Sequence, residues 1–457
     1  MGLFDKLKNF MGNADTPQTH HATDEIEPYS PEALDSPPYR FVEALHAARQ
    51  GQVAKIQDYL QFNAHYALCK NWDDCMLLHE AAASAQTEVL KQLLNAGSPV
   101  NALYKGNTPL HLLIEADETV NKSNASELIE NRKQRRMAAL VLIERGADLQ
   151  ATNEAGENPL HLAARLGLSE LVDLLLNKGV DVNSTIDSDK PNAGRTALLL
   201  VARYNKDKRT FKRLLDQGAD PNRQDQEPGF AALHYLASYR ATNQNIQNIK
   251  ESDLKELTQL LIQHHANLNL PTLDKQAYTP LHLAIIHHHL EMVTALVDAG
   301  ANLHAQDAKG LMPLGIAARR GEVELVKYLL DKGTDLYRSR ALFHAASCTD
   351  SSAVMEYLFE RGIDINMPDP QGYTPIFSAI SAYSLKNVKL LMEKGIDIKQ
   401  HSPRGLTVLE HAFACWGAVE DVSGEEIPPE RKQQADNARD IIQLLGGFDT
   451  PQRNRYI

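Results

Sequence analysis

The sequence predicts an all-α solenoid built from about eleven copies of one helical unit. Three observations lead to this fold class. A motif like Asn158-Pro-Leu-His-Leu-Ala-Ala164 recurs along the chain, its copies lie close to 33 residues apart, and apolar runs at helical spacing follow them and usually end at a glycine. A period of about 20–50 residues is typical of stacked repeats. The 457 residues are therefore expected to form one long array instead of about three ordinary domains.

The composition narrows the class of function. The chain has a net charge of −12, with 43% hydrophobic and 23% charged residues, which is typical of a protein that folds and stays in solution. A general nucleic-acid binder needs a basic face, so none is expected here. The four cysteines, at positions 69, 75, 348 and 415, are too few and too scattered for a disulfide framework, and they favour a reducing compartment. We expect no cofactor and no metal.

The first 40 residues differ from the rest. Residues 1–11 place Leu3, Phe4, Leu7, Phe10 and Met11 at helical spacing, which predicts a short amphipathic helix. Such a helix can lie on a membrane surface, dock on a partner or fold back on its own protein, and the sequence leaves these alternatives open. The remainder, up to residue 40, is acidic and rich in proline, as in a flexible linker.

The repeats define the order of the units. Aligned on the position of His161, the copies fall at Leu45, His79, His111, His161, Leu199, His234, His282, Gly315, His344, Phe377 and Glu410. Two long spacings, of 50 and 48 residues, and one short spacing of 29 interrupt a base period near 33. The long spacings indicate insertions. The short spacing, between Gly315 and His344, indicates that a loop near Tyr337 is truncated.

Thr108-Pro-Leu-His111 and Thr279-Pro-Leu-His-Leu-Ala284 resemble the opening of an ankyrin repeat, and the resemblance covers roughly residues 41–447. It implies that each unit has a short β-hairpin loop followed by two antiparallel helices. It also implies that the six histidines at the repeat position bridge neighbouring turns by hydrogen bonds. We expect insertions in this array near residues 115–137, 184–193, 240–253 and 417–431, and a C-terminal tail at residues 448–457.

In ankyrin-like arrays the loop tips and the inner ends of the first helices line a concave groove, which is the usual recognition surface of the family. Tyrosine and arginine are enriched at interface hot spots, and both are frequent at these positions in the last units. An acidic or extended partner segment would suit the arginines. The expected contact residues in units seven to eleven are Tyr278, Ile286, Leu311, Arg319, Arg320, Tyr337, Arg338, Arg340, Tyr373, Arg404 and Leu406. A second candidate region, near the N-terminus, contains Trp72 and Tyr104.

The sequence therefore favours a non-catalytic scaffold, a monomer, that binds another protein through the groove. One alternative is a membrane-peripheral adaptor anchored by residues 1–11. Another is an enzyme that uses Cys348 or Cys415 as its nucleophile, although the sequence has no phosphate-binding glycine loop and no nucleophile elbow. The irregular units and the start Met-Gly-Leu-Phe-Asp-Lys-Leu resemble ankyrin-repeat proteins of bacteria. That resemblance implies a cytoplasmic protein, or an effector delivered into a host cell.

Overall fold

The computed structural model describes residues 37–71, 73–116, 125–187, 189–240, 250–349, 351–420 and 429–447. Within these residues the chain forms 22 α-helices, which follow one another as eleven antiparallel pairs. Apart from two isolated bridges, Tyr104 with Asn107 and His401 with Thr407, the described residues contain no β-structure. This confirms the predicted all-α solenoid of about eleven helix-turn-helix units.

The helices, in order, are α3 (Pro37–Arg49), α4 (Val53–Phe62), α5 (Leu77–Ala83), α6 (Thr87–Asn95), α7 (Pro109–Glu115), α8 (Ala125–Glu144), α9 (Pro159–Leu166), α10 (Ser169–Asn177), α11 (Ala197–Tyr204), α12 (Lys208–Asp216), α13 (Ala232–Ala237), α14 (Glu251–Gln263), α15 (Pro280–Ile286), α16 (Leu290–Asp298), α17 (Pro313–Arg319), α18 (Val323–Asp331), α19 (Ala341–Ala346), α20 (Ser352–Glu360), α21 (Pro375–Ser381), α22 (Leu385–Glu393), α23 (Val408–Glu420) and α24 (Pro429–Leu444). A short 3₁₀ helix, Ala64–Ala67, follows α4.

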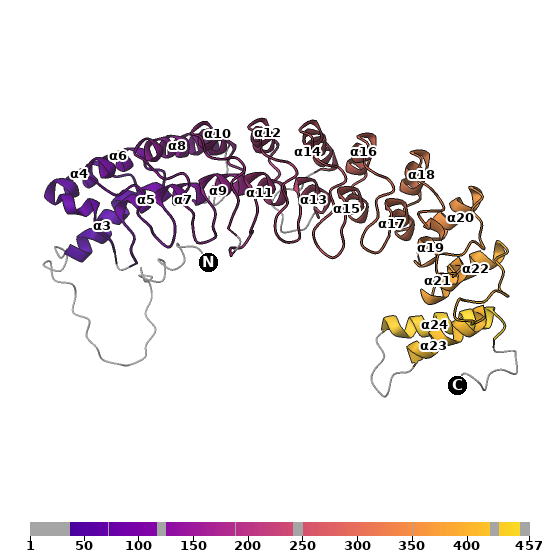
Figure 1. Cartoon of the computed structure of the whole chain (residues 1–457). Helices are drawn as coiled ribbons and strands as arrows, with labels where there is room; N and C mark the ends of the chain where they lie inside the picture. Colours follow the sequence, from indigo (N-terminus) through magenta and orange to yellow (C-terminus); the bar gives the residue numbers. More distant parts are fainter. Residues whose placement is uncertain are drawn as a thin grey trace, which may run out of the picture.

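The pairs stack into an arc with two layers (Figure 1). The second helices of the units, from α4 to α18, form the outer layer, and the first helices, from α3 to α17, form the inner layer. The loops that precede the first helices project from the inner layer on the concave side. After α17 the arc bends sharply, so that α21 to α24 lie on the concave side of the earlier units. The array is thus a curved scaffold with one pronounced bend.

The fourth unit shows why the repeat sequence folds in this way. The side chain of Asn158 accepts a hydrogen bond from the amide of His161 at 2.9 Å, which caps the N-terminus of α9. Pro159 occupies the first helical position, where the missing N–H costs nothing. Past the end of α10, Gly179 has a φ of 85°, a left-handed conformation that glycine adopts without strain. Each unit therefore carries its own start and stop signals.

The repeat histidine joins one unit to the next. His161 accepts a hydrogen bond at Nδ1 from the amide of Asn158, and its Nε2 lies 2.8 Å from the carbonyl oxygen of Ser184 in the following loop. Because a carbonyl can only accept, Nε2 carries the proton and donates it. The same bridge to the next loop recurs at His79, His111 and His234. Burial lowers the pKa of these imidazoles, that of His234 to about 4, so they are neutral at pH 7. The prediction of six bridges is wrong at His282 and His344, whose Nε2 atoms make no hydrogen bond to the next loop within the described residues.

Loop asparagines add a second link between neighbouring units. The side chain of Asn183 accepts a hydrogen bond from the amide of Asp220 at 2.8 Å and donates one to the carbonyl oxygen of Gly218 at 3.0 Å. Corresponding bonds to the next unit are made by Asn101, Asn222, Asn269 and Asn366. Beneath these polar links, one continuous hydrophobic core runs from Phe41 to Ile442. The units are therefore held by apolar stacking inside and by a ladder of hydrogen bonds along the loops.

The insertions lengthen particular elements. In the third unit the second helix, α8, has 20 residues. In the sixth unit α14 has 13 residues, and in the last unit α23 has 13 and α24 has 16. The loop at residues 184–193 folds back on the chain, where Ile186 is buried and its amide bonds to the carbonyl oxygen of Arg195. The predicted amphipathic helix at residues 1–11 and the tail at residues 448–457 lie outside the described residues. No helix in the described part of the chain is long and apolar enough to span a membrane.

Candidate interaction face

The bend coincides with a truncated loop. Residues 332–340 connect α18 to α19, whereas residues 299–312 and 361–374 make the corresponding connections before and after it, so this loop has nine residues against fourteen. Its residues form tight turns: the carboxylate of Asp335 accepts hydrogen bonds from the amides of Tyr337 and Arg338, each at 2.9 Å. Arg340 then enters α19 directly, with a φ of 50°. We call residues 334–340 the ninth turn.

Gly315 shows how closely the two inner helices approach at the bend. A Cβ atom on Gly315, in α17, would lie 2.9 Å from the carbonyl oxygen of Ser339 and 2.7 Å from Cδ2 of His344, in α19. At His79, His111, His161 and His234 the side chain at this repeat position reaches a full-length loop in the next unit. Here the next loop is truncated, and α19 lies directly against α17. The loop ladder also lacks links here, because the positions that correspond to Asn183 hold His304 and Tyr337, and neither side chain bonds to the next loop in the described residues. Gln150, in the fourth unit, likewise makes no such bond.

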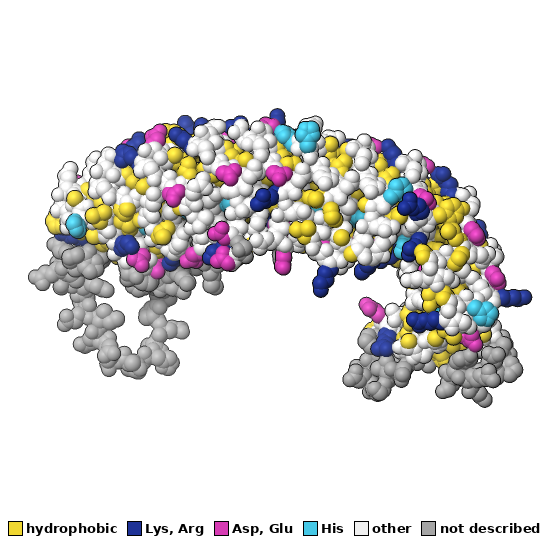
Figure 2. Space-filling model, viewed as in Figure 1, with side chains coloured by type: hydrophobic (Ala, Val, Ile, Leu, Met, Phe, Trp, Pro, Cys, Tyr) yellow, Lys and Arg dark blue, Asp and Glu magenta, His cyan; other side chains and the backbone are white. Residues whose placement is uncertain are grey.

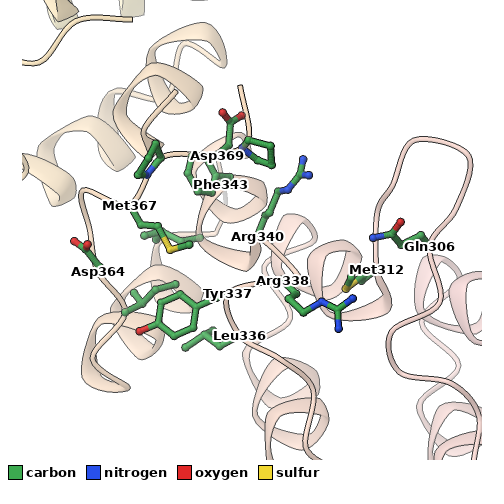
Figure 3. A pocket seen from close by; sticks show the side chains of 14 residues that line it. Gln306, Met312, Leu336, Tyr337, Arg338, Arg340, Phe343, Asp364, Met367 and Asp369 are labelled. Atoms are coloured by element: carbon green, nitrogen blue, oxygen red, sulfur yellow. The ribbon is translucent and has the colours of Figure 1, made fainter. Parts of the chain in front are cut away.

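The truncation of this loop leaves a cavity, which we call the notch. It has a volume of about 400 Å³ and is bounded by the eighth loop, the ninth turn and the tenth loop (Figure 3). Leu336, Phe343, Ile363 and Met367 provide half-buried apolar walls. Figure 3 shows Arg338 and Arg340 on the side of the eighth loop, with its Gln306 and Met312, and Tyr337 and Leu336 on the side of Met367 and Asp364. The notch therefore combines apolar walls with exposed arginines.

A second cavity, of about 520 Å³, lies next to the notch on the same face and shares Asp369 with it. Tyr373, Phe377 and His411 line it and form an aromatic row, with ring centroids 5.8 Å apart between the first two and 5.2 Å between the last two. Arg404 lies at its edge, exposed to solvent. Burial, followed by the positive charge of Arg404, lowers the pKa of His411. The cavity thus offers aromatic surface beside a cation.

Four of the predicted arginines form no ion pair within the described residues. Arg319, Arg338, Arg340 and Arg404 are exposed, and within the described residues none of them forms an ion pair or a side-chain hydrogen bond. Arg320 differs, because its guanidinium lies 2.7 Å from the carboxylate of Glu322. Figure 2 shows Lys and Arg side chains on the inner edge around the bend, whereas Asp and Glu predominate along the inner edge of the N-terminal half. The concave face is therefore polarised in charge along its length.

The charges of two of these arginines act on His344. Burial, followed by the positive charges of Arg319 and Arg340, lowers the pKa of His344 to about 4. A protonated imidazole would add a third positive charge beside theirs, so this histidine stays neutral. Arg319 comes from the end of α17 and Arg340 from the start of α19. Residues on both sides of the bend therefore contribute positive charge around His344.

The remaining predicted contact residues are less accessible than the arginines. Tyr278, Ile286, Leu311 and Tyr373 are half-buried and pack against the core, and Leu406 is also half-buried. Tyr337 is 47% exposed. Sequence reasoning did not single out Phe377 and His411. Phe377 occupies the position of the repeat histidine, and this departure from histidine was the only signal in the sequence. Because that position is a buried structural site in most units, the sequence did not indicate that Phe377 lines a cavity.

In the N-terminal candidate region, Tyr104 was predicted to be a contact residue, but its side chain is buried. Tyr104 is only 6% exposed, and its hydroxyl donates a hydrogen bond to Asp73 at 3.0 Å. Its ring lies 5.6 Å from that of His79, and Lys105 also pairs with Asp73. This side chain therefore fastens the loop to the preceding unit instead of offering a contact surface. Trp72 lies outside the described residues.

The cysteines named in the enzyme alternative lie on first helices of the array or just beyond them. Burial raises the pKa of the Cys415 thiol, and it raises that of Cys75 as well. A cysteine nucleophile needs the opposite shift, since the thiolate is the reactive form. In the described part of the chain, no group of three or more His, Cys, Asp or Glu side chains is placed to hold a metal ion. All four cysteines are free thiols.

The fold and its concave face define a repeat scaffold, and comparison with known proteins gives the family. A model of three consecutive ankyrin repeats matches residues 78–186, 125–225, 198–307, 299–369 and 314–402. The chain therefore belongs to the ankyrin-repeat family, as its sequence predicted. Ankyrin repeats mediate contacts between proteins, so the chain is a protein-protein interaction scaffold.

Individual relatives share the repeats over part of their length. The chain is 29% identical over 370 residues to transient receptor potential cation channel subfamily A member 1 from Homo sapiens, covering 77% of this chain and 29% of that protein. It is 34% identical over 151 residues to neurogenic locus notch homolog protein 2 from Homo sapiens, covering 33% and 5%. It is 38% identical over 108 residues to NF-kappa-B inhibitor alpha from Sus scrofa, covering 23% and 31%. The chain thus spans less than a third of the length of each of these relatives.

Proposed function

We propose that the chain is a non-catalytic scaffold whose concave face, from the seventh unit to the eleventh, binds an acidic segment of another protein. The observation that carries this proposal is the set of four exposed arginines without acidic partners: Arg319, Arg338, Arg340 and Arg404. They stand in a chain whose net charge is −12, so carboxylates are plentiful elsewhere. Arginines left unpaired on one face are available to carboxylates from outside.

Arginines in other parts of the array support this reasoning by contrast. Arg165 pairs with Glu157 at 2.8 Å, Arg213 with Asp173 at 2.9 Å, and Arg361 with Asp331 at 3.0 Å. Arginine presents planar donors that match a carboxylate, and such pairs are strongest when a partner excludes water. Charges of this kind mainly accelerate association and select the partner, while buried aromatic contacts supply much of the affinity. Tyr373 and Phe377, beside Arg404, provide that aromatic surface.

The proposal is tested by affinity capture from lysates of the producing cell, with bound proteins identified by mass spectrometry. The test variant carries Tyr373→Ala and Arg404→Ala. The matched control carries Tyr357→Ala, on α20, and Arg361→Ala, just beyond the end of that helix, with the guanidinium 5.2 Å from the ring centroid. We expect a partner that the wild-type chain and the control capture and the test variant loses, with unchanged circular dichroism in both variants. A partner that is retained by both variants, and also by a chain with Arg319→Ala, Arg338→Ala and Arg340→Ala, would place the binding site outside this face.

The other proposals rest on the sequence alone. They are a monomeric state, a cytoplasmic location, delivery into a host cell, and attachment to a membrane surface through residues 1–11. Liposome co-sedimentation of the full chain and of a chain without residues 1–11 tests the last of these. Equal binding by the two would remove it.

A further inference from the structure

The notch occupies the place where the ninth loop would stand in a regular array. The eighth and tenth loops flank it, and each is as long as the other. In a regular array their sides would be covered by the loop between them. Here they are separated by a cavity of about 400 Å³. We infer that the notch is a docking slot for an extended acidic peptide segment of a partner protein, which takes the place of the missing ninth loop.

The walls of the notch suit a peptide main chain with apolar side chains. Leu336, Phe343 and Met367 are half-buried, so each still exposes apolar surface to water. An apolar side chain of a bound peptide would cover that surface, which favours binding. Pro368 and Pro370 are exposed on the tenth loop. Proline has no N–H, so Pro368 and Pro370 offer a ligand apolar rings and carbonyl acceptors on this wall but no backbone donor.

The charges in the notch select an acidic ligand. Asp335 accepts hydrogen bonds from two backbone amides in the ninth turn, and Asp369 accepts two from the amides of Gln371 and Tyr373, each at 2.9 Å. These carboxylates are therefore engaged within their own loops. Asp364 and Asp369 keep their negative charge but are held by amides of their own loop, whereas the guanidinium groups of Arg338 and Arg340 form no hydrogen bond or ion pair in the described residues. One carboxylate of the ligand, placed against the two arginines and away from these aspartates, would complete the site.

A polyanion such as single-stranded nucleic acid fits the notch less well. Its phosphates would meet Asp364 and Asp369 as well as the arginines, because both carboxylates also line the cavity. A peptide can place one acidic side chain against the arginines and apolar side chains against the walls. The inference rests on the proposed function, since it specifies which part of the concave face binds and what it binds.

The test begins with a phage-displayed library of random dodecapeptides, selected against the full chain. Selected peptides are labelled with fluorescein, and their dissociation constants are measured by fluorescence anisotropy. The first variant carries Arg338→Glu and Arg340→Glu. Its matched control carries Lys327→Glu and Lys332→Glu on the outer helix α18 and just beyond it, which changes the net charge by the same amount. A second variant inserts five residues after Tyr337, which restores the usual loop length and keeps both arginines.

We expect the selected peptides to be acidic with interspersed apolar residues. Their affinity should fall at least about tenfold in the charge-reversed variant and in the loop-filled variant, and change little in the control. A peptide with its acidic residues replaced by lysine should bind the charge-reversed variant better than the wild-type chain. A benzophenone amino acid at position 337 should cross-link to the peptide. The loop-filled variant keeps the test informative if charge reversal disturbs folding, and circular dichroism identifies such a disturbance.

Other results would overturn the inference. Peptides that bind the notch variants normally but are lost with Tyr373→Ala and Arg404→Ala would move the site to the neighbouring cavity and leave the proposed function intact. Selection of neutral or basic peptides, or of none, would remove the acidic slot. Binding of a fluorescein-labelled oligothymidylate with the same sensitivity to charge reversal would show a site for polyanions. The lysate capture described above decides the proposed function independently of these outcomes.

Discussion

The close approach of α17 and α19 predicts that adding a single methyl group at Gly315 will loosen the bend. In Gly315→Ala the new Cβ would lie 2.9 Å from the carbonyl oxygen of Ser339 and 2.7 Å from Cδ2 of His344. The imidazole can turn aside, but the carbonyl belongs to the backbone of the ninth turn and can move only with that turn. One helix or the turn must therefore shift.

The expected magnitude is a balance of two terms. Alanine is favoured over glycine inside a helix by up to about 1 kcal/mol, which would stabilise the variant. Overpacking a closely packed contact costs about 1–3 kcal/mol, which opposes it. Because one of the two short contacts is with backbone, we expect the second term to win, with a net destabilisation of about 1–2 kcal/mol.

Hydrogen exchange measured by mass spectrometry is the appropriate assay, because long repeat arrays do not unfold as a single two-state unit. We expect faster exchange in Gly315→Ala for the amides of α17 and α19, and little change in the first units, since each repeat contacts only its neighbours. The matched control is Gly417→Ala in α23, where an added Cβ would meet nothing within 4 Å. This control should slow exchange locally through helix propensity alone. If Gly315→Ala slows exchange as the control does, the argument from close packing is refuted.

Three further predictions concern the links between units. Asp225→Ala should lower the local free energy of opening, measured by hydrogen exchange, by about 3–5 kcal/mol, because it removes the only carboxylate that pairs with the buried guanidinium of Arg195 in the described residues, whereas Asp331→Ala in the exposed pair with Arg361 should change it by less than about 1 kcal/mol. Stability should fall as pH decreases from about 6.5 to about 4, since the unfolded state takes up a proton on His234 before the folded state does; His234→Gln should flatten the pH dependence of urea unfolding in this window, and an unchanged slope would contradict it. Asn183→Asp should keep the amide of Asp220 protected from hydrogen exchange, because the acceptor remains, while Asn183→Ala should lose that protection; equal protection in both would show that the bond is not formed.

The sequence predicted the unit and its order well because these are local properties. A capping residue, a proline at the first helical position and a left-handed glycine act within a few residues of their own position, and they recur at Asn158, Pro159 and Gly179. The histidine bridges extend only to the next loop. A pattern in a single sequence therefore contains nearly all that one unit and its contact with the next require.

The candidate site was less predictable because it depends on how far the chain moves when a loop is shortened. The short spacing before His344 indicated a truncated loop, but the direction of the bend follows from the approach of α17 to α19, and Gly315 was only a weak copy of the motif. The same limitation applies to Tyr104, whose burial depends on the hydrogen bond to Asp73 in the preceding loop. Exposure of a loop residue is set by the neighbouring unit, which the residue's own repeat does not describe.

The truncated loop explains both the bend and the notch as one event. In a stack of repeats, the inner edge is filled by loops and the outer edge by second helices, so the removal of five residues from one loop shortens the inner edge at that point alone. The inner helices close the gap, which curves the array toward the concave side (Figure 1), and Arg319 and Arg340, on either side of the bend, both act on the charge of His344. The gap is closed only at the level of the helices, and it persists between the eighth and tenth loops. A variant with a restored loop should therefore straighten the array as it fills the notch, and small-angle X-ray scattering should record a larger radius of gyration. An unchanged radius of gyration in a folded variant would show that helix packing sets the bend independently of loop length.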